Sequence, residues 1–402
     1  MFQRQHWSVG FIGFVVVLVG LLILPSQRAH AASEVKVGLV VPLTGKLAPF
    51  GKSSQAACEI ATDLINRAGG VKGLGGAKVV LLSVDSGSDP TSAGSAAQRL
   101  LSREKVSAVI GCFASSLSLA ASEVTERNRV PFLTMSFTDK LTERGFKYIF
   151  QVVPKATVIG AAQITQAIDI GKKTGHPVKR VAILFEDTAY GGSQADGLDA
   201  KAKEAGIEVT LKEGYPSGIT DVTSVIQKLR MAEADIVEPV SYFTDAVLII
   251  RSMRQAGLTT PVFGGAAGYV IPEFSKTLGD LAEGVFSVNT SNYDHYGEIG
   301  DIYRKKVGKF MPHEAFEHAV CLYAIAAAMD DAKTSDPEKL GPALHKINLT
   351  TMPAAGLPGG GIKFDASGLN ILAYPITAQW QKGEMVSVWP EGYAKGQPYW
   401  PK

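Results

Sequence analysis

The stretch from Val109 to Ser118 reads VIGCFASSLS, an apolar run that stops at a glycine and continues into hydroxyl-bearing residues. The run from Lys105 to Ile110 has the β-branched enrichment of a buried strand, and small and apolar residues recur at helical spacing from Ser116 to Arg127. The pattern predicts a strand, a tight turn and a helix whose N-cap is Ser115 or Ser116. Such a helix start, at the carboxyl edge of a sheet, binds carboxylates and phosphates. A helix cap without a ligand is the competing interpretation.

Outward from this stretch, strands alternate with helices. In the first part of the chain we expect strands at 35–41, 78–84 and 130–135, with helices at 52–67 and 91–104. The same order restarts at Val178, with strands at 179–185, 207–215, 235–237 and 261–265. One helix is expected at 192–205, and a second follows the strand at 235–237 and ends at Gln255. Parallel strands need crossover helices, so the alternation predicts an α/β fold of two similar doubly wound parallel-sheet lobes. Ligands bind at the carboxyl ends of such strands, which places a cleft between the lobes.

The last part of the chain departs from this order. Past Gly284 come an aromatic-rich polar segment, Phe286–Asn289, and an apolar helix, Glu314–Asp331. Two strands then follow, at 373–381 and 385–389, joined by a turn at Lys382-Gly383.

The N-terminus predicts export. Val9 to Leu24 is a run of sixteen uncharged residues between Arg4 and the small-residue sequence Ala29-His-Ala31. A charged start, a short apolar core and small residues at the end are typical of a cleaved signal peptide, and the core falls short of the roughly 20 residues of a membrane span. We therefore expect residues 1–31 to be a signal peptide and the mature protein to be periplasmic, with an uncleaved anchor as the alternative.

Charge and cysteine content exclude some functions. The full chain has 40 basic and 38 acidic residues, and removal of residues 1–31 takes away two arginines and no acid, leaving 38 of each. A nucleic-acid partner is not expected, because it would require a basic excess. The three cysteines, Cys58, Cys112 and Cys321, allow at most one disulfide. We expect them to be buried and to pack as small hydrophobic residues. Their spacing matches no metal site.

Several motifs together resemble one family. They are the strand with its Pro-Leu-Thr-Gly continuation at 35–45, Asn66-x-x-Gly-Gly70, Asp85 to Pro90, Val109-Ile-Gly111, Leu141 to Gly145, Tyr190-Gly191 and Gly214-Tyr215-Pro216. As a set they are similar to those of the periplasmic leucine/isoleucine/valine-binding proteins of ATP-driven importers, over essentially the whole mature chain. The resemblance implies a type I periplasmic-binding fold with three crossovers, placed near Val153–Lys155, Phe286–Asn289 and Phe364–Leu372. It implies an N-terminal lobe of residues 32–153 with 288–366 and a C-terminal lobe of 154–287 with 367–402.

The resemblance also implies the ligand site. By motif alignment, the ligand carboxylate would be held by Ser115, Ser136 and Thr138, from the loops after the third and fourth strands. Tyr190 and Tyr242 match the aromatic positions of the second lobe, and Phe50 matches the residue that packs on the ligand's side chain, with a core aromatic as the alternative. Phe113, Phe137 and Phe243 would complete an aromatic lining.

The sequence departs from the family pattern at two places. Amino-acid binders carry an acid in the turn after the strand at 261–263, where it pairs with the ligand's ammonium group, and here Ala266 stands in its place. Glu238 is either a replacement charge or a salt-bridged surface residue. A disulfide that some members carry is absent, since its positions are Ser88 and Ala114.

The motifs that are typical of enzymes match this sequence less well. The sequence from Gly45 to Ser53 misses the phosphate-loop spacing by one residue. His313 and His318 lie five residues apart, about 140° around a helix, so they do not form a zinc-protease pair. Cys112 has no neighbouring histidine in the sequence.

The predicted function is that of a monomeric solute-binding component of an importer, which takes up a branched-chain amino acid or another small carboxylate and delivers it to a membrane permease without any cofactor. The alternatives are a receptor for aromatic or aliphatic acids that lack an amino group, and an extracytoplasmic sensor.

Overall fold

Five parallel strands form the sheet of the N-lobe, in the spatial order β2-β1-β3-β4-β5. The structure, a computed structural model, describes residues 1–3 and 34–401, so the predicted signal peptide lies outside the described residues apart from its first three. The strands are β1 (Glu34–Val41), β2 (Lys78–Asp85), β3 (Ala108–Gly111), β4 (Phe132–Thr134) and β5 (Ile149–Gln151).

The C-lobe repeats this order. A bridge between Val237 and Val262 joins its two sheets, which gives the order β7-β6-β8-β9-β10, and β13 and β14 extend it antiparallel beyond β10. The strands are β6 (Arg180–Glu186), β7 (Glu208–Tyr215), β8 (Ile236–Val240), β9 (Phe263–Gly264), β10 (Phe286–Asn289), β13 (Ile376–Gln381) and β14 (Glu384–Trp389). The matching orders confirm the predicted fold class of two doubly wound lobes.

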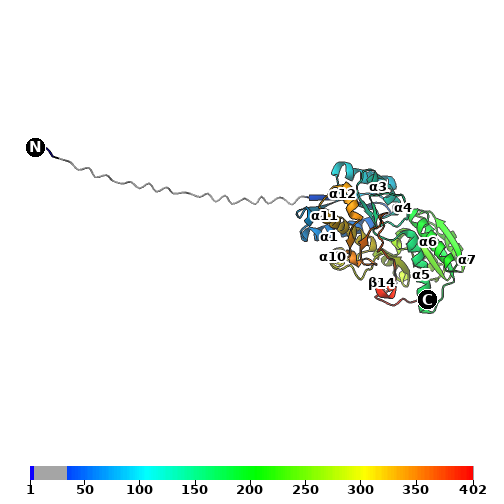
Figure 1. The fold of residues 1–402 in the computed structure, drawn as a ribbon. Helices are drawn as coiled ribbons and strands as arrows, with labels where there is room; N and C mark the ends of the chain where they lie inside the picture. The colour runs from blue at the N-terminus through cyan, green and yellow to red at the C-terminus, as the bar shows by residue number, and fades with distance from the viewer. Residues whose placement is uncertain (4–33, 402) are drawn as a thin grey trace. The chain divides into compact units, whose positions relative to one another are not determined.

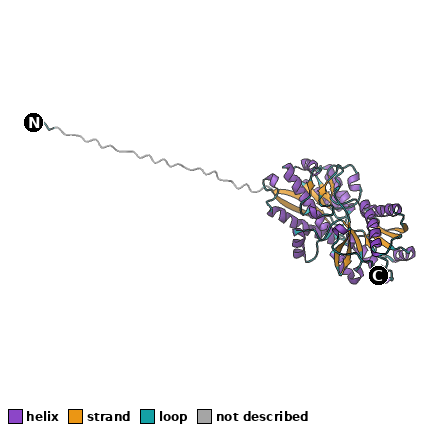
Figure 2. Cartoon of the chain, turned by 60° about the horizontal axis from the view of Figure 1, so that its bottom comes forward, coloured by secondary structure: helices purple, strands orange, loops and turns teal. Residues whose placement is uncertain are grey.

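Helices enclose both sheets (Figure 2). Those of the N-lobe are α1 (Ala48–Arg67), α2 (Pro90–Arg99), α3 (Ser115–Arg127), α4 (Lys140–Glu143), α10 (Glu298–Val307), α11 (His313–Ala332) and α12 (Pro337–Leu344). Those of the C-lobe are α5 (Ala156–Thr174), α6 (Ala189–Glu204), α7 (Thr223–Ala232), α8 (Phe243–Gln255) and α9 (Pro272–Leu278). In Figure 1, α1 and α11 lie together in one lobe, and α5 and α6 in the other. A short ribbon, β11 (Asn348–Leu349) with β12 (Ile362–Lys363), precedes the last crossing.

The chain passes between the lobes three times. The first passage lies between β5 and α5, at the predicted place. The second was predicted at Phe286–Asn289, and this is wrong, because those residues form β10 and pair with β9 and β13 inside the C-lobe. The polar and aromatic residues alternate along this segment as they do in a strand, and the chain crosses only after it. The third passage follows Leu369, which still bridges to Gln151 of the N-lobe. The exact domain boundaries stay a prediction.

The β3–α3 turn depends on one glycine. Gly111 has φ +148°, and a Cβ added there would lie 2.2 Å from the Val40 carbonyl oxygen of the neighbouring strand. Only glycine fits this approach, which lets β3 end level with β1 and turn sharply into α3.

Hydroxyl groups tie this turn to the one after β4. The Ser118 hydroxyl accepts the Cys112 N–H at 2.8 Å and lies 2.7 Å from the Ser136 hydroxyl. The Ser136 hydroxyl also reaches the carbonyl oxygens of Cys112 and Phe113, at 3.1 and 2.9 Å. All of these groups are buried, so the network fixes both turns.

We expect Ser118→Ala to lower the free energy of unfolding by about 1–3 kcal/mol, because it leaves the buried Cys112 N–H without an acceptor. Urea denaturation of the ligand-free protein measures the change. Ser116→Ala, two residues earlier and half-buried, is the matched control and should stay within about 0.5 kcal/mol of wild type. Equal stability of the two variants would contradict the role given to Ser118.

Candidate ligand-binding site

The α3 start differs from the prediction in one respect. The helix begins at Ser115 and its N-cap is Ala114, whose side chain makes no capping bond, so neither Ser115 nor Ser116 is the N-cap. The Ser115 hydroxyl instead accepts the Thr138 N–H at 3.2 Å. Because that bond uses an oxygen lone pair, the hydroxyl hydrogen of Ser115 remains a donor for another group. The N–H groups of Leu117 and Ser118 both bond to Ala114 O, which leaves the earlier N–H groups of α3 as helix-end donors.

Ser115 lines a small cavity between the lobes. The volume of the cavity is about 10 Å³, and its walls are Phe113, Ser115, Phe137, Tyr190, Tyr242 and Ala267. The first three follow β3 and β4 of the N-lobe, and the last three follow β6, β8 and β9 of the C-lobe. The lobes are therefore closed on each other with room for about one water molecule, so a ligand has to part these walls.

Aromatic rings from the two lobes meet across this cavity. Ring centroids of Phe113 and Tyr242 are 5.8 Å apart, and those of Phe137 and Tyr190 are 5.9 Å apart. Behind Phe113, the ring of Phe50 stacks at 4.0 Å with an interplanar angle of 11°. These spacings are those of favourable aromatic pairs, so flat apolar surface faces the ligand from both lobes.

No charged side chain lines this cavity in the described part of the chain. Burial raises the pKa of Tyr190 and of Tyr242 well above the usual value, so both phenols are neutral. The nearest buried acids are used within the C-lobe. Glu186 accepts the Thr188 hydroxyl at 2.7 Å and the Gly191 N–H at 2.8 Å, and Asp245 accepts the Gly218 N–H at 3.0 Å.

The turn after β9 has a strained backbone. Ala266 has φ +61° and ψ −143°, a conformation found almost only in glycine, and Ala267 follows with φ +41°. The Ala266 N–H donates to the Ser287 hydroxyl at 3.1 Å, and the Tyr190 hydroxyl donates to Gly265 O. These bonds hold the turn so that Ala267 contacts the cavity and Ala266 lies behind it.

Of the seven residues predicted for the site, Ser115, Tyr190 and Tyr242 line the cavity. The other four, Phe50, Ser136, Thr138 and Ala266, stand behind it, each buried. Ser136 is bonded into the turn network described above, and the Thr138 hydroxyl lies 3.0 Å from the Ser193 hydroxyl of the C-lobe. Phe113 and Phe137 were expected in the lining and are there, whereas Phe243 was also expected and is not among the lining residues. Ala267 was missed, although it is the direct neighbour of a predicted residue.

Glu238 is not on the surface. It lies in the middle of β8 with no exposed area, which excludes the salt-bridged surface role. Burial raises the pKa of its carboxyl group well above the usual range, and Gln163 is the polar side chain beside it. It is also not among the residues that line the cavity, so its position does not replace the acid missing at Ala266.

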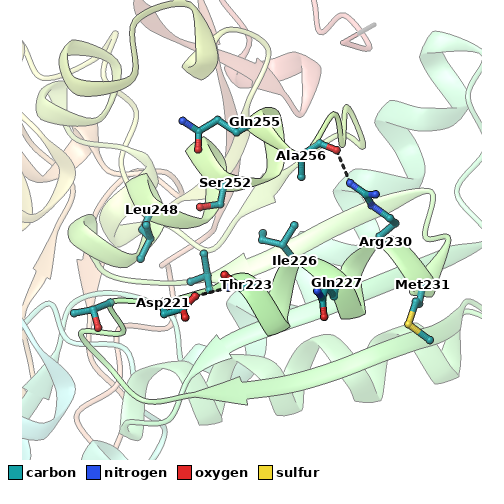
Figure 3. Close-up of a pocket in the computed structure, with 12 residues that line it drawn as sticks. Asp221, Thr223, Ile226, Gln227, Arg230, Met231, Leu248, Ser252, Gln255 and Ala256 are labelled. Atoms are coloured by element: carbon teal, nitrogen blue, oxygen red, sulfur yellow. Dashed lines mark hydrogen bonds between the residues drawn. The ribbon is translucent and has the colours of Figure 1, made fainter.

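A wider hollow lies elsewhere, between α7 and α8 (Figure 3). Its walls belong to the C-lobe alone, and within it Arg230 donates to Ala256 O at 2.6 Å. Because both walls lie on one lobe, ligand binding there would not couple to closure.

Comparison with known proteins identifies the family of this chain. The sequence model of the periplasmic binding protein family matches residues 34–382. A Leu/Ile/Val-binding protein homolog 8 from Brucella melitensis biotype 1 is 34% identical over 393 residues, covering 94% of this chain and 95% of that protein. This chain belongs to the periplasmic leucine/isoleucine/valine-binding protein family.

Solved structures of the family have the same fold. The leucine-binding protein LivK from Thermotoga maritima superposes with a TM-score of 0.77 at 25% identity, covering 88% of this chain and 97% of that one. A solute-binding protein of an ABC transporter from R. palustris, in complex with benzoate, also gives 0.77, at 18% identity and 88% and 95% coverage. The proteins that this family member resembles are therefore substrate-binding proteins.

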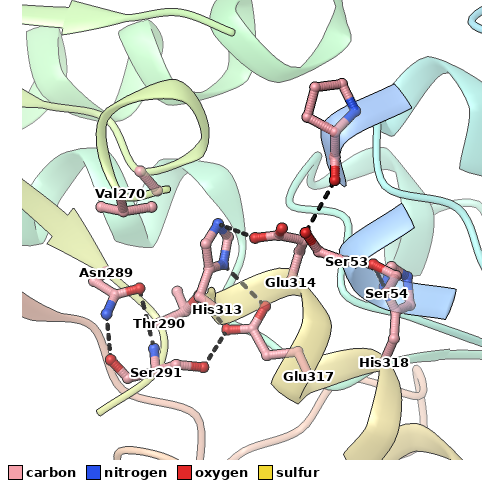
Figure 4. Close-up of polar contacts among 12 residues, drawn as sticks. Ser53, Ser54, Val270, Asn289, Thr290, Ser291, His313, Glu314, Glu317 and His318 are labelled. Carbon is pink, nitrogen blue, oxygen red and sulfur yellow. Dashed lines mark hydrogen bonds and ion pairs between the residues drawn. The ribbon is translucent and has the colours of Figure 1, made fainter. Parts of the chain in front are cut away.

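A second buried cluster lies beside the middle crossover of this binding protein (Figure 4). Glu317 accepts the hydroxyls of Thr290 and Ser291 at 2.6 and 2.9 Å, and its other oxygen lies 3.2 Å from His313 Nδ1. The His313 ring in turn stacks on Phe137 of the cavity wall, with centroids 6.0 Å apart. The crossover, α11 and the ligand cavity are thus in direct contact.

Protonation in this cluster is shifted by burial. Burial raises the pKa of Glu314 to about 8, and lowers that of His318 to about 4. Burial alone would lower the pKa of His313, but the neighbouring Glu317 carboxylate raises it on balance. Within the described residues no group of His, Cys, Asp and Glu side chains has metal-binding geometry, and His318 bonds instead to the Ser54 hydroxyl at 2.8 Å.

Because Glu314 is buried and its pKa is raised, we expect the free energy of unfolding of the wild type to fall as the pH rises from 4.5 to about 8. The unfolded chain releases this proton near pH 4.5, whereas the folded protein keeps it to about pH 8. The folded state thus binds more protons across this window, and its advantage is lost as the pH rises. Glu314→Gln removes the loss, so the melting temperature of the variant relative to wild type should rise from pH 5 to pH 8, by roughly 1 °C per kcal/mol for a chain of this length.

Thermal melts at pH 5, 6, 7 and 8 measure this difference. Glu298→Gln, at an exposed acid of α10, is the control and should follow the wild-type profile. Parallel profiles of wild type and Glu314→Gln would show that Glu314 does not titrate in this window.

Proposed function

We propose that this protein is the extracytoplasmic solute-binding component of an ABC importer, and that it binds a small carboxylate between its lobes. Membership of the family supports the role, and the closed cavity supports the place. In this proposal residues 1–31 are a signal peptide that sends the protein to the periplasm, where a monomer delivers its ligand to a membrane permease. None of the described helices is long and apolar enough to span a membrane.

The ligand carboxylate would bind at the start of α3. Ser115 lines the cavity, and because its oxygen accepts the Thr138 N–H, its hydroxyl hydrogen is available to a ligand oxygen. The Ser115 N–H itself is directed to the Tyr242 hydroxyl. The α3 start adds helix-end N–H groups and the positive end of the helix dipole. These groups bind an anion without a buried lysine or arginine.

The proposal about the ligand class rests on the lining of the cavity, which contains no charged side chain. An α-amino acid would bring an ammonium group into a cavity whose walls are four aromatic rings, one serine and one alanine. A buried charge without a partner costs several kcal/mol. Glu186 and Asp245 already accept bonds within the C-lobe, and Ala266 cannot supply the missing acid. We therefore propose a carboxylic acid that lacks an amino group, with an aromatic or aliphatic body.

A branched-chain amino acid is the second candidate. Similarity to a Leu/Ile/Val-binding protein homolog and to a leucine-binding protein favours it. The R. palustris protein in complex with benzoate, whose TM-score equals that of the leucine-binding protein, favours an acid without an amino group.

An enzyme is not supported at this site. Cys112 lies at the turn, but it is fully buried as a free thiol, and burial raises its pKa to about 12. The thiolate required of a nucleophile would be negligible near neutral pH. His318 Nε2 lies 3.3 Å from the Cys112 carbonyl oxygen, but burial lowers the pKa of His318 to about 4, so the imidazole is neutral. Full burial of Cys112 agrees with the role of a small core residue.

A thermal-shift panel tests the ligand class. It pairs leucine, valine and phenylalanine with 4-methylpentanoate, 3-methylbutanoate and 3-phenylpropanoate, and adds benzoate. We expect the acids to stabilise the protein, by about 2.7 kcal/mol at a hundredfold excess over the dissociation constant, and the amino acids to do so much less. Ser115→Ala should weaken acid binding roughly tenfold to a hundredfold, because a hydrogen bond to a charged group is worth about 1.5–3 kcal/mol.

Ser102→Ala, at an exposed serine of the N-lobe, is the matched control and should bind as wild type does. Strong shifts with the amino acids and none with the acids would contradict the proposed ligand class. Equal affinity of wild type and Ser115→Ala would remove Ser115 from the site.

A further inference from the structure

Among the side-chain contacts that join the lobes without lining the ligand cavity, two come from the loops after β1 and β4 of the N-lobe. The Lys46 ammonium donates to the carbonyl oxygen and the hydroxyl of Ser217, at 3.3 and 3.0 Å. The Thr138 hydroxyl lies 3.0 Å from the Ser193 hydroxyl. Lys46 and Thr138 belong to the N-lobe, and Ser217 and Ser193 belong to the C-lobe. Both contacts exist only while the lobes are closed.

Sheet order places the contacts on either side of the cavity. Lys46 follows β1 and Thr138 follows β4, and β3, whose loop supplies Phe113 and Ser115, lies between these two strands. A rotation that parts the lobes would separate both pairs, since each partner is attached to a different sheet.

The Lys46 contact is supported by charge. The Ser217 N–H donates to Asp187 at 3.2 Å and the Gly218 N–H donates to Asp245 at 3.0 Å, so two carboxylates hold the turn that receives the ammonium group. Gly218 lies against this group, because a Cβ added there would be 3.5 Å from Lys46 Nζ. The negative field of the turn therefore attracts Lys46 across the cleft.

The Thr138 contact is preorganised. The Thr138 N–H is held by Ser115, as described above, and Ser193 lies in the first turn of α6, whose N-cap is Thr188. Neither hydroxyl needs to move to meet the other once the lobes close, so the contact costs little side-chain entropy.

Another contact between the lobes is an ion pair, in which Lys309 donates to Glu273 of α9. Both residues line a hollow beside the start of α1, together with Ala48, Pro49 and Lys52. Because this ion pair also joins the lobes, it is left unchanged in every variant described below.

We propose that Lys46–Ser217 and Thr138–Ser193 form a two-point latch, which populates the closed state before ligand binds and sets the affinity for all ligands by one common factor. The statement about affinity rests on the proposed function, and the statement about the closed state does not. A ligand that binds the closed form has an apparent dissociation constant equal to the intrinsic one divided by the closed fraction. Removing a latch contact lowers that fraction and leaves the cavity walls, and thus ligand preference, unchanged.

Single-molecule fluorescence transfer between the lobes tests the closed state without ligand. Ser102→Cys in the N-lobe and Met231→Cys in the C-lobe place dyes at exposed positions, and the three native cysteines are fully buried. The wild-type background should show a closed population, which Lys46→Met and Ser193→Ala each reduce and the double variant reduces most. Lys46→Arg, which keeps a donor of similar reach, should restore it.

The affinity arm uses benzoate, 4-methylpentanoate and leucine as probes. Lys46→Met and Ser193→Ala should each weaken every probe that binds by the same factor, about two- to tenfold. The matched controls are Lys140→Met and Ser224→Ala, at an exposed lysine of the N-lobe and an exposed serine of the C-lobe, and both should behave as wild type.

An unliganded wild-type protein that is entirely open, or latch variants with the wild-type distribution, would overturn the proposal. So would a loss of affinity confined to one probe. If no acid binds at all, the proposed ligand class fails, but the fluorescence distributions still decide the latch.

Discussion

The bond from the Cys112 N–H to the Ser118 hydroxyl is the interaction on which the ligand site depends. Through Ser136 it locks the turn after β3 to the turn after β4, within a fully buried group of hydroxyls. These two turns carry the N-lobe half of the cavity, including the start of α3 and the rings of Phe113 and Phe137. A shift of either turn would move the start of α3 relative to the rings, so the shape of this wall depends on Ser118 and Ser136, which are not among the lining residues.

The C-lobe supplies the other wall of the cavity. It contributes two neutral phenols and the strained Ala266–Ala267 turn, held in place by Ser287 and by the Tyr190 hydroxyl. Glu186 and Asp245 accept backbone N–H groups within the C-lobe, and Glu238 is buried in β8 outside the lining. The proposal of a ligand without an ammonium group rests on this uncharged lining.

The sequence predicts the architecture well because the strands and helices have clear periodicity. It identifies both lobes, the cavity rings and Ser115, since these follow from strand ends and motif spacing. It misplaces the middle crossover, because the short alternating segment at Phe286–Asn289 is itself a strand. It also assigns Ser136 to the ligand, and the structure has that hydroxyl bonded to neighbouring carbonyl oxygens. Spacing along the chain gives the loop to which a hydroxyl belongs, but the direction in which it points depends on tertiary contacts.

The latch residues illustrate the same limit. Lys46 and Ser193 carry no motif. Lys46 lies 171 residues from its partner Ser217, and Ser193 lies 55 residues from Thr138, so these contacts follow only from the way the two lobes face each other. The burial of Glu238 is likewise invisible in the sequence, where a glutamate is most often a surface residue.

The proposed ligand is a carboxylate without an ammonium group. Mass spectrometry of the small molecule released on denaturing the purified protein, before and after treatment with an amine-reactive reagent, tests this directly. We expect a carboxylic acid whose mass is unchanged by the reagent. A released branched-chain amino acid, shifted in mass by the reagent, would contradict it.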